Sequence, residues 1–303
     1  MNRTVFEKYT GNDAAVRVEF TGDGEAITAI GAKAFLSCKT VKKLEIASSV
    51  TEIGDWAFAH MQNLEVLELP FRELTFGRKV FLDCGKLVQI QISGDESANP
   101  GLPFFLASAV RVLKQEELCI PIEAADSKKH REWMEKYDLT LMQFLLEDDE
   151  KGFDPVFFGW FRVEDIDDQL PGFLARKRRD KVQLIFERLF YSFYLKDENK
   201  ERMLAYLSEH MNPLHFKEDF APKEKRKVHS AVYDFFCEEN SPCRQDIRYF
   251  KILKENALLH TGLIEQFLMD IKEPTAEVTA YLLKEKAKLS QKRSFFDDFG
   301  FEL

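Results

Sequence analysis

The chain has 303 residues, of which 45% are hydrophobic and 31% charged, and 28 of them are phenylalanine. This is enough apolar material for one large core or two smaller ones. The formal net charge of −9 argues against a general nucleic-acid binder, because phosphate neutralisation needs a net basic surface.

The sequence contains neither a membrane span of 18 or more apolar residues nor, in its first 25 positions, an apolar run of signal-peptide length. Its five cysteines are an odd number, and Cys38 and Cys84 occupy a repeat position that Met61 also fills, as expected of small buried hydrophobic residues. We therefore expect a cytoplasmic protein, or a secreted one if a signal peptide has been removed.

The first predicted element is a strand over Val16, Val18 and Phe20, followed by a turn at residues 22–24. A stack of repeats requires terminal caps. We expect this strand to cover the open end of the repeats that follow.

A period of 23 residues then runs through the chain. In each of three copies an apolar residue precedes a glycine, a phenylalanine follows four residues later, and four more positions stay in register. The members are Ile30/Ile53/Phe76, Gly31/Gly54/Gly77, Phe35/Phe58/Phe81, Cys38/Met61/Cys84, Val41/Leu64/Leu87, Leu44/Leu67/Ile90 and Ile46/Leu69/Ile92. Such a period predicts a solenoid of parallel strands, with the phenylalanines stacked inside and the glycines at tight turns. A degraded fourth copy is expected at Phe104, Ala107, Val110 and Leu113.

The repeats resemble the BspA-like, or treponemal-type, leucine-rich repeats over about residues 20–115. That class reads roughly as isoleucine, glycine, phenylalanine, cysteine and leucine, then a strand of leucine and isoleucine followed by proline. The second copy follows this pattern at Ile53, Gly54, Phe58, Met61, Leu64, Leu67, Leu69 and Pro70. The resemblance implies a curved right-handed solenoid that recognises proteins or surface ligands, and it carries over no catalytic residue.

The outward side of the repeat strands is the predicted binding surface, because alternation along a strand places the neighbours of the buried residues in solvent. One row is expected to hold Lys43, Val66, Gln89 and Val112, and the next row Glu45, Glu68, Gln91 and Lys114. Four strands spaced by about 4.8 Å make a face about 15 Å across, which suits a short peptide or one loop. The alternative is a sheet face that is merely solvated, or covered by the helical part of the chain.

From about Pro121 the apolar periodicity becomes helical. The strongest stripe is Val182, Ile185, Phe186, Leu189, Phe190, Phe193 and Tyr194. Weaker stripes follow near residues 228–236, 247–253 and 263–271, separated by prolines. The last two helices, over about 260–289, are similar in rhythm to an ankyrin or HEAT-type hairpin. We predict two domains: a repeat solenoid with its cap strand over 1–120, and an α-helical domain over 121–303.

Three other features invite a chemical interpretation. The basic run Arg176 to Lys181 could contact phosphate or an acidic partner, or could lie on the wet face of a helix. The acidic run Glu147 to Glu150 is expected to be a solvated turn. The tail from Ser294 to Leu303 contains four phenylalanines and either folds back onto the helices or docks on another protein.

No constellation of reactive residues accompanies these features. His210 and His215 straddle a proline, and Cys237 and Cys243 lack a second pair of zinc ligands. No nucleophile elbow and no glycine-rich phosphate loop is present. We therefore predict no enzyme activity, no cofactor and no metal.

The leading hypothesis is a non-enzymatic interaction module that binds a protein or peptide partner, and neither nucleic acid nor membrane. Two alternatives stay open at this point. One is a regulatory or enzymatic helical domain that the solenoid targets, and the other is a secreted adhesin or effector.

Overall fold

A computed structural model describes the chain over residues 3–94, 100–115, 118, 128–147, 149, 163–211 and 230–298, with side chains left out at 163–173 and 291–298. The chain forms two compact units. One comprises Met1–Leu146 and Phe190–Lys196, and the other Glu147–Leu189 and Asp197–Leu303. Whether residues 1–120 and 121–303 fold as independent domains stays a prediction.

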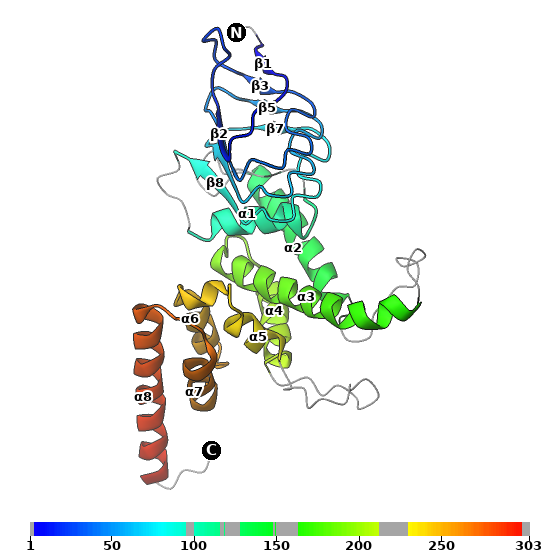
Figure 1. Cartoon of the computed structure of the whole chain (residues 1–303). Helices are drawn as coiled ribbons and strands as arrows, with labels where there is room; N and C mark the ends of the chain where they lie inside the picture. Colours follow the sequence, from blue (N-terminus) through cyan, green and yellow to red (C-terminus); the bar gives the residue numbers. More distant parts are fainter. Residues whose placement is uncertain are drawn as a thin grey trace. The chain divides into compact units, whose positions relative to one another are not determined.

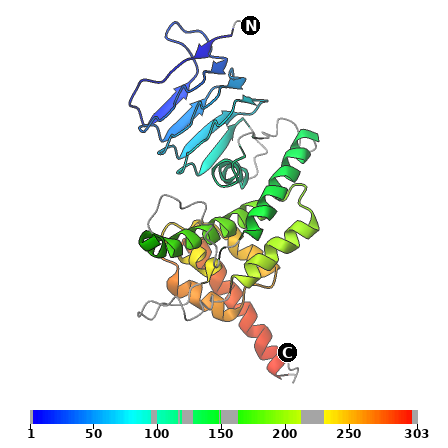
Figure 2. The ribbon, with the colours of Figure 1, turned by 90° about the vertical axis from the view of Figure 1, so that its right-hand side faces the viewer.

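The first unit begins with a parallel β-solenoid of about four turns (Figure 1). Each turn gives one strand to each of two sheets. The first sheet has the order β1 (Val5–Phe6), β3 (Ala29–Ile30), β5 (Glu52–Ile53) and β7 (Thr75–Phe76). The second has the order β2 (Ala15–Val18), β4 (Lys43–Ile46), β6 (Val66–Pro70) and β8 (Gln89–Ser93), stacked as parallel rungs in Figure 2. The solenoid and its period of 23 residues are confirmed, while the short strands of the first sheet were not predicted.

A ladder of phenylalanine rings fills the solenoid. Phe35, Phe58 and Phe81 are 1%, 0% and 3% exposed. Their ring centroids are 6.0 Å and 5.9 Å apart from one rung to the next, within the range of favourable aromatic pairs. Phe6 extends the ladder toward the N-terminus, with its centroid 5.3 Å from that of Phe35. The predicted stacking of these rings is confirmed.

The glycine column is required by the close approach of successive rungs. A Cβ on Gly54 would lie 2.6 Å from the amide nitrogen of Ala32, and one on Gly77 would lie 2.5 Å from that of Asp55. The left-handed backbone angles fall two and six residues after the glycines, as at Trp56 (φ 60°) and His60 (φ 58°). The glycines therefore permit stacking, and the sharpest backbone turns belong to other residues.

The N-terminal strand is itself the outermost rung of the second sheet, so it lies at the end of the repeats, and its role as a cap stays a prediction. β2 pairs in parallel with β4, with Val16 opposite Leu44 and Val18 opposite Ile46. These partners are 28 positions apart, because a short hairpin closed by a bridge between Phe20 and Ala26 adds residues to the turn. Because of these extra residues β2 does not follow the 23-residue period, so the period alone does not identify it as a rung.

The degraded fourth copy is a helix, which corrects the prediction of a fourth repeat strand. α1 (Leu102–Arg111) has Pro103 in its first turn and buries Leu102, Phe105, Leu106 and Ala109, at the spacing of a helical face. It packs against β8 at the end of the solenoid. A proline at this position favours a helix start, so the local pattern favours a helix over another rung.

α2 (Lys128–Leu146) and the segment Phe190–Lys196, which also belong to the first unit, cover α1. In α2, the rings of Trp133 and Tyr137 lie 5.7 Å and 4.2 Å from that of Phe105. Tyr191, from the segment Phe190–Lys196, lies 5.1 Å from the same ring. Phe105 is fully buried as a result.

The second unit is helical. Its elements are α3 (Val163–Phe190), α4 (Asp197–Glu209), α5 (Ala231–Cys237), the 3₁₀ helix η3 (Pro242–Arg244), α6 (Arg248–Glu255), α7 (Thr261–Asp270) and α8 (Ala276–Asp298). Its core is again aromatic. The ring centroid of Phe236 lies 5.6 Å from that of Phe186, 5.0 Å from that of Phe250 and 4.9 Å from that of Phe267. The predicted helical region is confirmed, although α3 ends at Phe190 and does not continue to Tyr194. None of the described helices has the length and apolar character of a membrane span. The resemblance to ankyrin or HEAT hairpins stays a prediction.

Candidate functional site

The outward side of the second sheet, which we call the strand face, brings most of the predicted residues together. Lys43, Val66 and Gln89 occupy neighbouring positions in one row. Glu45, Glu68 and Gln91 form the next row. Between the two rows Leu44, Leu67 and Ile90 point inward and are fully buried, which forces their neighbours outward.

Val112 and Lys114 do not belong to the strand face, which is a correction to the predicted rows. Val112 caps the C-terminal end of α1, and the ammonium of Lys114 donates a hydrogen bond of 2.9 Å to the carbonyl of Arg111. The fourth position of each row is filled at the opposite end of the sheet. Ala15 lies beside Lys43, and Arg17 beside Glu45.

A ladder of ion pairs covers the N-terminal half of the strand face. The guanidinium of Arg17 lies 2.9 Å from the carboxylate of Glu45 and 2.8 Å from that of Glu19. The hydrogen bond from Arg17 to Glu19 and the charges of both carboxylates raise the pKa of Arg17. The ammonium of Lys43 lies 3.4 Å from Glu68, which also accepts a 2.6 Å hydrogen bond from Ser93.

The cations of this ladder are more exposed than the carboxylates. The side chains of Arg17 and Lys43 are 56% and 49% exposed, against 28% for Glu45 and 22% for Glu68. Exposed ion pairs contribute at most about 1 kcal/mol each. A charged ligand can therefore replace one member of these ion pairs at a small cost in free energy.

The last strand of the strand face, β8, carries no charge on its predicted residues Gln89 and Gln91. Gln91 donates a 3.0 Å hydrogen bond to Gln89, and Val66 lies beside Gln89 in the same row. Val88, which precedes β8, is 51% exposed. Hence the face offers ion pairs at one end and amide and aliphatic groups at the other.

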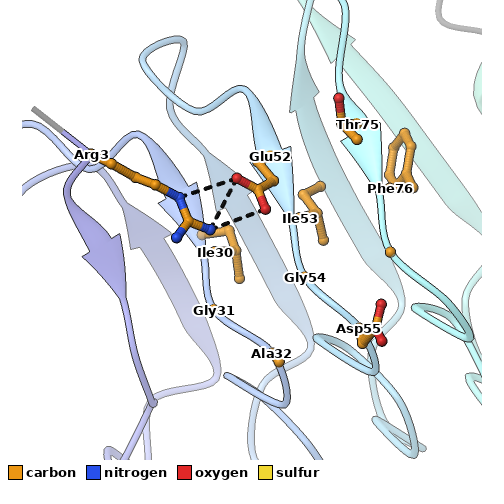
Figure 3. A pocket seen from close by; sticks show the side chains of 11 residues that line it. Arg3, Ile30, Gly31, Ala32, Glu52, Ile53, Gly54, Asp55, Thr75 and Phe76 are labelled. Carbon is orange, nitrogen blue, oxygen red and sulfur yellow. Dashed lines mark hydrogen bonds and ion pairs between the residues drawn. The ribbon is translucent and has the colours of Figure 1, made fainter. Parts of the chain in front are cut away.

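A groove follows the glycine column along the first sheet (Figure 3). Its volume is about 280 Å³, and its floor includes Gly31, Gly54 and Gly77. At one rim Arg3 binds Glu52 at 3.0 Å, as the dashed lines in Figure 3 show. At the other rim lies Asp55, which accepts hydrogen bonds from the backbone and side chain of Arg78; these bonds lower the pKa of Asp55. We had not predicted this groove, although the recurring glycines were a signal for it.

The basic run is engaged in ion pairs within the second unit. Lys177 binds Glu147 at 2.9 Å, and Arg179 binds Glu238 at 2.6 Å. Lys181 is 1% exposed and binds Asp149 at 2.9 Å. These pairs favour a structural role for the run over a phosphate contact.

Asp149 is the centre of a buried polar network that sequence reasoning missed. Its carboxylate accepts hydrogen bonds from Lys181 at 2.9 Å and from Tyr206 at 2.8 Å, and the Nε2 atom of His210 lies 3.9 Å away. Burial opposes the charge, but the hydrogen bonds from Lys181 and Tyr206 and the nearby imidazole of His210 hold the pKa of Asp149 well below its usual value. Burial also lowers the pKa of Lys181 and raises that of Tyr206. The network joins α3 and α4 to the segment that contains Asp149, so its evident role is cohesion.

Among the residues that the structure describes, the remaining candidates of the sequence show no assembled chemistry. Over the described ranges, no three or more histidine, cysteine or acidic residues are grouped to hold a metal ion. Cys84 and Cys237 are free thiols whose pKa burial raises to about 11, which disfavours the reactive thiolate. His215, Asp148 and Glu150 lie outside the described residues, as do the side chains of the C-terminal tail.

A comparison with known protein families finds a match for the repeat region. Residues 18–100 match the family profile described as the BspA type leucine-rich repeat region, in six copies. The chain matches no curated protein and no solved structure.

Proposed function

Because residues 18–100 are a BspA-type leucine-rich repeat region, we propose that this chain is a non-enzymatic interaction module that binds a protein or peptide through its strand face. Solenoids of repeats generally use such extended surfaces for recognition. The observation that carries the proposal is the register of β2, β4, β6 and β8, which holds the outward side chains in straight rows. Rows on a rigid sheet keep their geometry before a ligand arrives, and such preorganisation lowers the entropic cost of binding.

The dimensions and chemistry of the strand face limit the kinds of ligand that can bind there. Four strands at about 4.8 Å spacing span about 15 Å, so the face suits an extended peptide or one loop of a folded partner. Glu45 and Glu68 are direct neighbours on adjacent strands, and their carboxylates can accept hydrogen bonds from a basic or amide side chain. The amide pair at Gln89 and Gln91 offers both donors and acceptors.

Capture of partners from the native lysate tests the proposal. The wild type is compared with the double variant Glu45→Lys, Glu68→Lys, and we expect the variant to lose the partner by at least tenfold. The control is Glu7→Lys, Glu25→Lys, which makes the same change of charge at two exposed positions of the solenoid outside the strand face. Circular dichroism checks that each variant is folded.

Two results would contradict the strand face as the binding surface. One is a wild-type protein that enriches no partner over the beads alone. The other is a partner that both double variants retain equally. No observation favours the alternative of an enzymatic helical domain, since the Asp149 network is buried and serves to hold helices together.

A further inference from the structure

Trp56 occupies a repeat position at which the solenoid does not need an aromatic residue. The same position holds Lys33 one rung earlier and Lys79 one rung later, and the three share a left-handed backbone with φ of 62°, 60° and 54°. Both lysines are exposed, and Trp56 is partly exposed. The unusual backbone is therefore a property of the position, whereas the indole is peculiar to this rung.

The groups around the indole come from its own rung and from the next one. The ammonium of Lys79 lies 5.2 Å from the ring centroid, a distance at which a cation is attracted to the ring. The ring of His60 lies 6.4 Å away and bonds to Asp83 at 3.2 Å. Trp56 thus sits in a polar rim, the arrangement typical of a residue that dominates an interface.

The charge that faces outward around Trp56 is positive. Lys33 and Lys79 are exposed, and the Arg78 side chain is 87% exposed. Asp55, the residue before Trp56, accepts hydrogen bonds of 2.8, 3.0 and 3.2 Å from Arg78, so these two charges offset each other and the excess positive charge comes from Lys33 and Lys79. Asp83 is likewise engaged by His60 and by Gln62 at 3.3 Å.

We infer that Trp56, Lys33, Arg78 and Lys79 form a second docking surface, the Trp56 patch, for an acidic peptide segment that lays an apolar side chain on the indole. Tryptophan and arginine are the residues that most often dominate binding energy, and complementary charge selects and orients the partner. The patch lies on the loops that connect the two sheets, and it does not depend on binding at the strand face. Single-stranded nucleic acid also stacks on aromatic residues beside cations, but it does so base after base on several aromatic side chains; the Trp56 patch offers a single indole, which favours the peptide.

The test uses the full chain and capped pentapeptides at low salt. The probe is Glu-Glu-Phe-Glu-Glu, with Lys-Lys-Phe-Lys-Lys and Glu-Glu-Gly-Glu-Glu as controls and an oligo-dT as the nucleic-acid probe. Binding is followed by isothermal titration calorimetry, which does not depend on the indole and therefore also serves the Trp56→Lys variant. We expect saturable binding of the first peptide only, and a loss of affinity as salt increases.

The decisive variant is Trp56→Lys, because lysine is what both neighbouring repeats carry at this position. It is expected to keep the unfolding midpoint of the wild type and to bind the acidic peptide at least tenfold more weakly. Phe20→Lys removes another exposed aromatic residue of the solenoid and is expected to change nothing. Lys33→Glu keeps the indole and reverses one charge, so it is expected to weaken binding even if Trp56→Lys fails to fold.

Each opposite result overturns the proposal. These results are no binding of the acidic peptide by the wild type, equal binding by wild type and Trp56→Lys, or tighter binding of oligo-dT than of the peptide. Loss of peptide binding in Glu45→Lys, Glu68→Lys with Trp56 intact would assign the binding to the strand face instead. The two surfaces are thereby tested separately.

Discussion

At the scale of single residues, each strand position from β3 to β8 has its counterpart 23 residues away as a direct neighbour. His60 bonds to Asp83 at 3.2 Å, Arg78 to Asp55 at 3.0 Å, and Lys86 to Asn63 at 2.9 Å, each across this interval. A substitution therefore first affects the residue at the same repeat position in the next rung. The glycine column is the strictest case, because there the neighbour is backbone.

Gly54→Ala is expected to destabilise the solenoid strongly. The new Cβ would lie 2.6 Å from the Ala32 nitrogen and 2.9 Å from the Gly31 carbonyl carbon, so whole rungs must move apart. Overpacking of this kind costs about 1–3 kcal/mol and occasionally more. Urea unfolding followed by circular dichroism measures the loss.

Gly85→Ala is the matched control for this prediction. No atom lies within 4 Å of a Cβ at Gly85, and restricting the unfolded chain stabilises a protein by about 0.4–1 kcal/mol. Equal effects of the two substitutions would mean that the rungs do not stack closely at the glycines.

How far a residue's role could be read from the sequence depended on where its partners lie in the chain. The inward phenylalanines and six residues of the strand face follow from the period together with strand alternation. Asp149 could not be understood in this way, because its partners Lys181 and Tyr206 are 32 and 57 positions away and share no period with it. The acidic run therefore looked like a solvated turn.

At the scale of elements, the period fails at both ends of the solenoid, where the core must be closed. β2 keeps the rung geometry with extra residues in its turn, whereas α1 replaces the rung. The sequence carried the local signal for α1, in Pro103 followed by apolar residues at helical spacing. It was obscured because some of the same residues also matched the repeat register.

The second unit relies on buried charge at the junction of α3 and α4. Lys181 and Asp149 are 1% and 6% exposed, and removing one member of a buried pair leaves the other without its counter-charge. Such a change typically costs about 3–5 kcal/mol. The Asp149 network thus makes the stability of this unit dependent on one carboxylate.

Asp149→Asn is expected to lower the stability of the second unit at pH 7 by about 3–5 kcal/mol and to reduce its sensitivity to acid. The pKa of Asp149 is held well below its usual value in the folded protein, and it is about 3.9 in an unfolded chain. Its contribution is therefore complete above about pH 4 and disappears as the pH falls toward the folded pKa. Urea unfolding of wild type and variant at pH 7, 5 and 3 gives the difference.

Glu238→Gln controls for the loss of a carboxylate as such. It removes the partner of Arg179, whose side chain is 31% exposed, and a pair of this exposure contributes at most about 1 kcal/mol. If wild type and Asp149→Asn lose stability in parallel on acidification, Asp149 does not carry the pH dependence.

At the scale of the whole molecule, the solenoid is continued by helices that the repeat pattern does not include. Phe105 on α1 is covered by Trp133 and Tyr137 from α2 and by Tyr191 from the segment after α3. The first unit thus draws on residues well beyond 120. Sequence periodicity placed the change from strands to helices near Pro121, after the helix α1 (Leu102–Arg111) has already ended. It held no information on which helices pack with the solenoid, because those contacts join distant parts of the chain.

Phe105→Ala tests whether the solenoid is an independent domain. Its effect on the free energy of unfolding is measured in the full chain and in fragment 1–120. Phe105 is fully buried in the whole protein, where its loss is expected to cost about 3–5 kcal/mol. In the fragment its three aromatic partners are missing, so we expect a cost below about 1 kcal/mol, as for an exposed side chain, together with a lower stability of the fragment itself. Urea unfolding with circular dichroism provides both values. An equal cost in both proteins would show that Phe105 is held by the solenoid alone, and a fragment that does not fold would refute the predicted domain over 1–120.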